Sequence, residues 1–495
     1  MNEIFDQIRS WVALTPQQIA LESRTEILSY AELWQQVETL SAQLTAAGIA
    51  HIGILLPNSP TWVVLQLAAF HAGIPVTPIP AFFSLEQQRH ALDQSGVDLL
   101  FSDDADQGRR LDPRFASDPL HPLAYRRPPR PVALPNGTLL VTFTSGSTGT
   151  PKGVCLGGAH LSQVCRSLFR RVGGCGVTRH ACLLPLSILL ENLAGVLLPL
   201  YAGSRCLIYS NNETGLLGSS GLDLQSLGEF LHRHQPESLI LTPELLKALL
   251  YLCSAGLSPQ GFRLLAVGGA RVPASLLQRA HELGLPVVEG YGLSECGSVV
   301  ALNAPDKQRA GSCGYPLDHC RITLADDGEV IVTGSGFLGY LGDTSPHHGA
   351  VATGDIGYLD QDGYLHIEGR KKNVFITSYG RNLSPEWIEA EFAALPQIQQ
   401  FCLFGDGRPF NVAVLRARPG VSADELARAI ATVNSVLPDY ARLTHWIQAE
   451  EPFTVANDLL TGNGRIRRDA VGASYRESLD AIYSRHEEPH CHGVL

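Results

Sequence analysis

Residues 138–153, TLLVTFTSGSTGTPKG, decide the fold class of this chain. The first six residues are apolar or β-branched, which predicts a buried strand. The next ten, TSGSTGTPKG, combine glycines, serines and threonines with Lys152. Backbone N–H groups and hydroxyls of such a loop can converge on phosphate oxygens, and the lysine adds a positive charge. The stretch therefore predicts a strand that leads into a phosphate-binding loop.

The P-loop of nucleotide triphosphatases is the obvious alternative for this loop. A P-loop places Ser or Thr directly after its lysine at the start of a helix. Here Pro151 precedes Lys152 and Gly153 follows it, so the pattern differs. A plain Gly/Ser-rich surface turn is the second alternative, but it does not require ten positions in this order. We therefore expect a different kind of phosphate cradle.

Upstream of the loop, helical and extended patterns alternate along the chain. Ser29 and Glu32 form a capping-box signature, and the helix that they open is expected to end at Gly48. Two more helices are predicted from Ser59 and from Ser84, with extended segments between them. Strands that alternate with helices predict a parallel or mixed sheet covered on both faces. The Pro-, Arg- and Asp-rich segment 103–135 is expected to be a surface excursion.

Composition excludes several classes of protein. The chain has 495 residues, 45% hydrophobic and 17% charged, which indicates a globular protein of two or more domains. A net charge of -11 without basic patches argues against nucleic-acid binding. Eleven cysteines without a CxxC pair, and a start that does not resemble a signal peptide, predict a reduced, cytoplasmic location.

Two further segments have a structural and a functional interpretation. The apolar segment 183–203 contains Glu191 and Asn192, so we expect a buried core element and no membrane-spanning helix. The terminal sequence HCH at 490–492 could bind a metal by composition. A frayed terminus is the preferred interpretation, because the sequence offers no other cluster of ligands for a tetrahedral site.

The segment TSGSTGTPKG resembles the signature loop of the adenylate-forming superfamily, which includes acyl-CoA synthetases, peptide-synthetase adenylation domains and luciferases. The other landmarks of that family follow in order, so the resemblance covers essentially the whole chain. They are VGGA at 267–270, YGLSE at 291–295, TGD at 353–355, GRKKN at 369–373 and TGNGRIRRD at 461–469.

The resemblance implies a role for each motif. Tyr291 would stack on adenine, Glu295 would hold Mg²⁺ and Asp355 would bind the ribose hydroxyls. Lys152 and Glu295 would assist catalysis at the phosphates, together with Arg465. The remaining residues expected to contact the nucleotide are Thr144, Ser145, Gly146, Ser147, Thr148, Gly149, Gly269, Ala270, Gly292, Ser294 and Arg370. Each of these acids and basic residues could alone be a solvated surface group; their joint order favours the functional interpretation.

The resemblance also implies the architecture, an α/β fold. Residues 1–371 would form a large N-terminal AMP-binding domain of two βαβ-layered subdomains plus a small β-barrel-like region. Residues 372–495 would form a small, mobile α+β domain that rotates about Lys372 between adenylation and thioester formation. Short strands at 373–376 and 379–383 and a helix from Ser384-Pro385 are predicted there. A plain basic surface turn is the alternative for RKKN at 370–373.

The chain departs from the family at two places. Arg465 stands where the family has a lysine that bridges the substrate carboxylate and the nucleotide, and arginine spreads the same charge over a planar fork. We expect Arg465 to keep the role with slower adenylation; substitution by Arg467 or Arg468 is the alternative. In the predicted acid pocket, LPLSILLEN at 184–192 has Ser187, Ile188 and Leu189 where many family members have an aromatic residue or histidine. No secure equivalent is visible of the aspartate that amino-acid-activating domains pair with a substrate ammonium group, so a fatty or aryl acid is expected.

These observations predict an AMP-forming acid–thiol ligase. It would use ATP and Mg²⁺ to convert a carboxylic acid to acyl-AMP with release of pyrophosphate, and would pass the acyl group to coenzyme A. Two alternatives remain: a ligase that loads the phosphopantetheine of an acyl carrier protein, and a non-catalytic nucleotide- or acyl-binding relative. The second is disfavoured because Lys152, Glu295, Asp355 and Arg370 are all retained.

Overall fold

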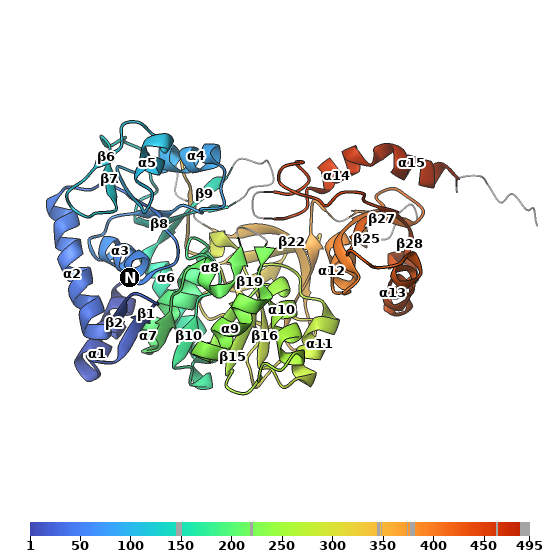
Figure 1. The fold of residues 1–495 in the computed structure, drawn as a ribbon, viewed down its shortest axis with the longest axis horizontal. Helices are drawn as coiled ribbons and strands as arrows, with labels where there is room; N and C mark the ends of the chain where they lie inside the picture. Colours follow the sequence, from blue (N-terminus) through green and yellow to red (C-terminus); the bar gives the residue numbers. More distant parts are fainter. Residues whose placement is uncertain are drawn as a thin grey trace, which may run out of the picture.

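The computed structural model describes residues 1–144, 151–217, 221–343, 347, 349–373, 375–376, 382–461 and 464–485. The described chain forms two large sheets, a small sheet and a C-terminal α+β region (Figure 1). No helix within these ranges combines the length and the hydropathy that a membrane span needs.

The first sheet has eight strands and holds the predicted phosphate-loop strand near its centre. In spatial order the strands are β21 (Phe337–Tyr340), β9 (Lys152–Gly157), β8 (Thr138–Thr144), β4 (Val76–Pro78), β3 (Ile52–Leu55), β5 (Leu99–Ser102), β7 (Ala124–Arg126) and β6 (Ala116–Ser117). Strands β5, β3, β4 and β8 are parallel. Helices α3 (Pro60–His71) and α4 (Leu85–Ser95) connect them, and α2 (Tyr30–Ala46) precedes them.

The second sheet has nine strands. In spatial order they are β18 (Tyr315–Pro316), β17 (Ala301–Leu302), β16 (Val287–Tyr291), β15 (Leu264–Val267), β14 (Ser238–Leu241), β10 (Arg179–Ala181), β11 (Arg205–Leu207), β1 (Ile19–Glu22) and β2 (Ile27–Ser29). Strands β11, β10, β14, β15 and β16 are parallel, so their carboxyl ends lie at one edge. In open sheets of this kind ligands bind at that edge.

Helices cover both faces of the second sheet. On one face pack α6 (Gly158–Val172), the π-helix η2 (Glu191–Leu197) and α7 (Leu198–Ala202); on the other pack α9 (Leu224–His234), α10 (Pro243–Ser254) and α11 (Ala274–Glu282). Strand β15 follows the strand periodicity of two: Leu265 and Val267 enter the core under α9–α11, and Leu264 and Ala266 face the α6 side.

The last part of the chain carries two smaller units. The predicted small β region is a four-stranded antiparallel sheet of β19 (Arg321–Leu324), β20 (Glu329–Thr333), β22 (Val351–Leu359) and β23 (Leu365–Arg370). The C-terminal region contains β24 (Phe375–Ile376), β25 (Asn382–Leu383), β26 (Ile398–Phe404), β27 (Asn411–Ala417), β28 (Leu443–Gln448), α12 (Pro385–Ala393), α13 (Ala423–Val436), α14 (Arg468–Ser474) and α15 (Arg476–Arg485). It buries its own hydrophobic clusters, separate from those of the large sheets.

Several short elements complete the described chain. They are α1 (Asn2–Leu14), α5 (Ala105–Leu111), α8 (Asn211–Thr214), β12 (Leu216–Leu217), β13 (Gly221–Leu222) and the 3-10 turns η1 (Gly173–Cys175), η3 (Ser294–Cys296) and η4 (Asp439–Ala441).

Most of the local predictions are confirmed. The capping box at Ser29 and Glu32 opens α2, and the predicted buried strand is β8. The apolar segment with Glu191 and Asn192 is buried in the core as η2 and α7. The prediction for 103–135 was wrong in part: this segment contains α5 and adds β7 and β6 to the sheet edge, because β7 pairs antiparallel with β5. The turn at Gly380 and the terminal residues His490, Cys491 and His492 lie outside the described residues.

Candidate active site

A single cavity of about 2820 Å³ brings the predicted motifs together. It opens at the carboxyl edge of the second sheet and extends to the C-terminal region. Every predicted site residue that the structure describes lines it: Thr144, Lys152, Gly269, Ala270, Tyr291, Gly292, Ser294, Glu295, Asp355, Arg370, Lys372 and Arg465. Ser145, Gly146, Ser147, Thr148 and Gly149 lie outside the described residues.

One end of the cavity holds the ends of the predicted phosphate loop and the predicted metal ligand. Thr144 and Lys152 are paired across β8 and β9, so the loop leaves from and returns to adjacent strands. The Lys152 ammonium lies 5.5 Å from the centre of the Tyr340 ring. The Tyr340 hydroxyl donates a hydrogen bond of 3.0 Å to Oε1 of Glu295. Tyr340 thus contacts both the lysine and the carboxylate that the motifs assign to the triphosphate.

A second group of side chains forms the predicted nucleoside end. The Tyr291 hydroxyl donates to Oδ2 of Asp355 at 2.5 Å, and Arg370 Nε lies 2.9 Å from Oδ1 of the same carboxylate. Burial raises the pKa of the Asp355 carboxyl, although Arg370 and the Tyr291 hydrogen bond oppose the rise. Burial and the neighbouring Asp355 also raise the pKa of Tyr291, so its hydroxyl stays a donor. The cluster orients one acid, one phenol and one guanidinium toward each other.

Glycine is required within this site where the backbone is closely approached. A Cβ at Gly292 would collide with the backbone of Ser298 and Val299. Gly269 has φ +79°, a left-handed conformation that side chains rarely adopt, and its carbonyl points into the cavity toward Arg465. These two positions keep backbone groups at the cavity surface.

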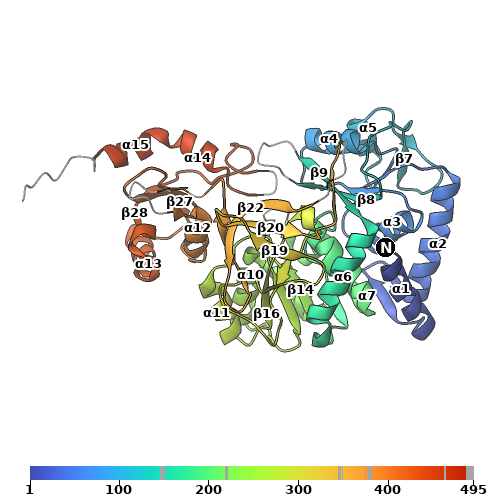
Figure 2. The same cartoon turned by 180° about the vertical axis from the view of Figure 1, so that it is seen from behind.

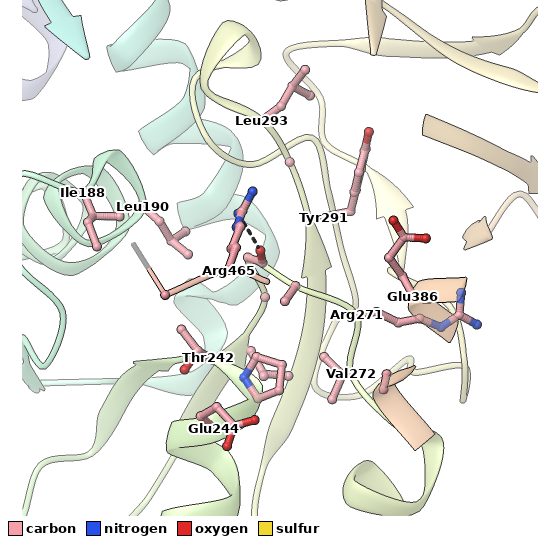
Figure 3. Close-up of a pocket in the computed structure, with 18 of the residues that line it drawn as sticks. Ile188, Leu190, Thr242, Glu244, Arg271, Val272, Tyr291, Leu293, Glu386 and Arg465 are labelled. Carbon is pink, nitrogen blue, oxygen red and sulfur yellow. Dashed lines mark hydrogen bonds between the residues drawn. The ribbon is translucent and has the colours of Figure 1, made fainter. Parts of the chain in front are cut away.

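Arg465 reaches the cavity from the C-terminal region. Its Nη2 lies 3.4 Å from the carbonyl oxygen of Gly269, and Figure 3 shows its side chain between Leu190 and Tyr291. Arg467 is instead paired with Asp458, and Arg468 with Glu389 at 2.5 Å. Of the three arginines in this motif, Arg465 is therefore the one placed for contact with a ligand at the Gly269 edge.

Other contacts seat the C-terminal region against the second sheet. Lys247 on α10 donates to the carbonyl of Ala393 at 2.6 Å. The Arg271 guanidinium lies 6.0 Å from the ring centre of Trp387 on α12, and it also donates to the carbonyls of Ile367 and Glu368 in β23 of the small sheet at 2.9 Å each. Lys372, the predicted hinge, lies where the small sheet passes into this region. Figure 1 shows α12 beside α10 and α11.

Tyr340, Arg271 and Glu289 are among the cavity residues that the sequence did not predict. Burial raises the pKa of Glu289 to about 8, against the opposing charge of Arg271. The position of Glu289, two residues before Tyr291, was an available signal. Arg271 directly follows VGGA at 267–270 and carried the same kind of signal, whereas Tyr340 lies outside all of the motifs and carried none.

Comparison with known proteins identifies the family. Residues 8–341 match the family described as AMP-binding enzyme, and residues 372–487 match the AMP-binding enzyme C-terminal domain. The chain belongs to the AMP-binding enzyme family. The predicted superfamily is thereby confirmed.

Named relatives and solved structures agree with this assignment. The chain is 24% identical over 420 residues to a 2-succinylbenzoate–CoA ligase of Bacillus subtilis, covering 78% of this chain and 82% of the relative. It is 28% identical over 425 residues to a feruloyl-CoA synthase of Amycolatopsis, covering 79% and 83%. These comparisons confirm the predicted enzyme class, an AMP-forming ligase of the acyl-CoA synthetase type.

Among solved structures, the fold is similar to that of the Bacillus subtilis o-succinylbenzoate CoA synthetase in complex with AMP. The TM-score is 0.75 at 22% identity, covering 94% of this chain and 97% of that one. The anthranilate CoA ligase AuaEII in complex with anthranoyl-AMP gives a TM-score of 0.76 at 17% identity, covering 96% and 98%. The predicted α/β fold, with a large N-terminal and a smaller C-terminal part, is confirmed.

Proposed function

We propose that this enzyme uses ATP and Mg²⁺ to activate an apolar carboxylic acid, fatty or aryl, as acyl-AMP, and then transfers the acyl group to coenzyme A. The observation that supports this proposal is that the Tyr291–Asp355–Arg370 cluster, Glu295 and Arg465 all line one cavity. The named relatives are CoA ligases, which supports coenzyme A as the acceptor.

The chemistry of the donor set fits an adenine nucleotide. Asp355 offers carboxylate oxygens to the vicinal hydroxyls of a ribose, and Arg370, whose Nε lies 2.9 Å away, opposes the rise in the carboxyl pKa that burial causes. Tyr291 provides an aromatic face beside them, where a purine can stack. The backbone exposed at Gly269 and Gly292 lets a flat base approach closely.

The phosphate end fits a magnesium–triphosphate group. Glu295 is half-exposed and lines the cavity, and among the described residues the one hydrogen bond recorded to its carboxylate comes from Tyr340. A hard carboxylate oxygen that stays open to the cavity is a suitable Mg²⁺ ligand. When bound, the ion would neutralise charge on the phosphates. Lys152 supplies a further positive charge at the exit of the loop.

Adenylation requires the acid's carboxylate oxygen to attack the α-phosphorus of ATP, with pyrophosphate as the leaving group. Two anionic groups must approach each other, so positioning and positive charge account for most of the rate. Arg465 is placed for this role, because its guanidinium lies at the Gly269 edge between Leu190 and Tyr291. It would hold the carboxylate against the nucleotide.

Thioester formation needs room for a thiol at the same carbonyl. We propose that residues 372–495 form a mobile domain, hinged at Lys372, that withdraws Arg465 after adenylation. Among the described residues, hydrogen bonds from Lys247 to Ala393, from Ala274 to Glu391 and from Arg465 to Gly269 hold the present arrangement; such a small set is compatible with rotation of a small domain.

Product analysis with purified protein tests the proposal. ATP, Mg²⁺ and a panel of carboxylic acids are incubated with and without coenzyme A, and AMP, pyrophosphate and acyl-CoA are quantified. We expect AMP and acyl-CoA in equal amounts only when the acid is present. Pyrophosphate release without acyl-CoA would favour a carrier-protein acceptor instead. No turnover with any acid would support a non-catalytic relative.

A further inference from the structure

The same cavity continues away from the nucleotide end, between the second sheet and the helices on its α6 face. Its floor is formed by Ile240 of β14 and by Leu264 and Ala266 of β15, and its walls by Ala194 and Leu198 of η2 and α7. Figure 2 shows α6 and α7 lying along this side of strands β14 and β16. We call this part of the cavity the tail passage.

The pattern of buried and partly exposed side chains along β15 and η2 shows which side of each element faces the tail passage. Leu265 and Val267 are 0% and 2% exposed on one face of β15, whereas Leu264 and Ala266 on the other face are partly exposed. Ala194 is likewise partly exposed within an otherwise buried π-helix. These side chains pack against the main core, so their accessible surface faces the passage. Alanine at 194 and 266 leaves space that larger side chains would fill.

The tail passage has a near and a far mouth. Its near mouth lies at Leu190 and Gly269, where Arg465 is seated. Its far mouth lies past the amino ends of β10 and β11, where the lining residue Thr178 is exposed and Ser204 is buried. The passage runs along β15 and is lined by both Leu264 and Gly268, which are four positions apart. At a strand rise of ~3.3 Å per residue this stretch alone is about 13 Å long. Phe169, 39% exposed, lines the far part.

The polar groups on the wall are paired with one another. His180 Nδ1 lies 2.8 Å from Ser238 Oγ, and its Nε2 lies 3.3 Å from Oε1 of Glu191. The other oxygen of Glu191 accepts from the backbone N–H of Leu184 at 2.9 Å. The wall therefore offers apolar surface without an unpaired charge, so it does not require a polar group on the ligand.

We propose that the tail passage holds the hydrocarbon tail of the substrate and that the preferred substrates are straight-chain fatty acids of medium to long length. This inference rests on the proposed function, since the carboxylate of such an acid would sit at Arg465. A compact aryl acid would fill the near mouth alone and leave Ala266 and Leu264 facing water. An unbranched chain covers this surface, and the far mouth lets a longer tail emerge.

The test is a chain-length profile of kcat/KM for acid-dependent AMP formation. Butanoic, octanoic, dodecanoic and hexadecanoic acids are compared with benzoic and cinnamic acids. Between butanoic and dodecanoic acid we expect a rise of about fourfold per methylene group, equivalent to ~0.8 kcal/mol each. Hexadecanoic acid should match dodecanoic acid, and both should exceed the aryl acids.

Two variants test the passage itself. Ala266→Phe and Ala194→Phe fill it from opposite sides and should each lower kcat/KM for dodecanoic acid roughly fiftyfold. Butanoic acid, whose tail stays at the near mouth, should change by less than about twofold. Ala42→Phe adds the same bulk on an exposed position of α2 and is the matched control. Thermal unfolding of each variant identifies any that fail to fold.

The outcomes separate the two proposals. A wild-type enzyme that prefers aryl or short acids overturns the tail passage and leaves the proposed function standing. Equal losses on butanoic and dodecanoic acids in folded variants also overturn it. If no acid gives AMP, the proposed function itself fails. If one variant unfolds, the other variant and the chain-length profile of the wild-type enzyme still test the proposal.

Discussion

Replacing Arg465 with alanine should slow adenylation without affecting thioester formation. Arg465 Nη2 is 3.4 Å from the Gly269 carbonyl, at the edge where we propose that the acid carboxylate meets the nucleotide. Removing one preorganised donor from such a site costs on the order of 10²–10³-fold, or ~3–4 kcal/mol. Because the observed contact is long, we expect the lower end, about a hundredfold. Arg465→Lys restores the family's residue and should match or exceed the wild-type rate of adenylation.

Single-turnover kinetics measure the two half-reactions apart. Pyrophosphate release at saturating acid and MgATP reports adenylation, and conversion of supplied acyl-AMP with coenzyme A reports thioester formation. Arg467→Ala is the matched control, because the Arg467 guanidinium is paired with Asp458 whereas that of Arg465 contacts Gly269. An unchanged rate of pyrophosphate release in the Arg465 variant, or an equal loss in the Arg467 variant, would refute the reasoning.

Three further predictions concern residues that line the cavity. Asp355→Asn should raise KM for ATP roughly tenfold and leave KM for the acid unchanged, because a charged hydrogen-bond acceptor contributes ~1.5–3 kcal/mol; equal changes in both constants would contradict a ribose-binding role. Tyr340→Phe removes the donor to Glu295 and should raise the magnesium concentration for half-maximal rate about fivefold; an unaltered magnesium titration would show that the contact does not position the ligand. The Glu289 carboxyl, with its pKa raised by burial from 4.5 to about 8, stays protonated in the folded protein over a range where the unfolded chain has lost the proton. Its contribution to stability therefore falls as pH rises through that window, so Glu289→Gln should flatten the pH dependence of urea unfolding, whereas parallel profiles would exclude this titration.

Local structure could be predicted where a short sequence pattern determines it. The capping box at Ser29 depends on residues three apart, and α3 begins at the predicted Ser59-Pro60. The predicted site residues also converge, because their motifs lie at strand ends and turns that meet at one sheet edge. Segment 103–135 misled the prediction because its place at the sheet edge depends on pairing with β5.

Features that depend on long-range packing could not be predicted. Tyr340 meets Glu295 because β21 pairs with β9, a strand from much earlier in the chain. The raised pKa of Glu289 depends on burial that no neighbouring residue signals. The tail passage exists because small side chains at Ala194 and Ala266, far apart in sequence, line the same cavity. In one sequence such alanines are indistinguishable from ordinary core residues.

Transfer of a labelled oxygen tests the central claim, that an acyl-AMP forms in this cavity, most directly. The acid is labelled with heavy oxygen in its carboxylate and converted with ATP, Mg²⁺ and coenzyme A, and the products are weighed by mass spectrometry. Attack of the carboxylate on the α-phosphorus predicts one labelled oxygen in each AMP formed. Label in inorganic phosphate with ADP as the nucleotide product, or AMP without label, would contradict the account.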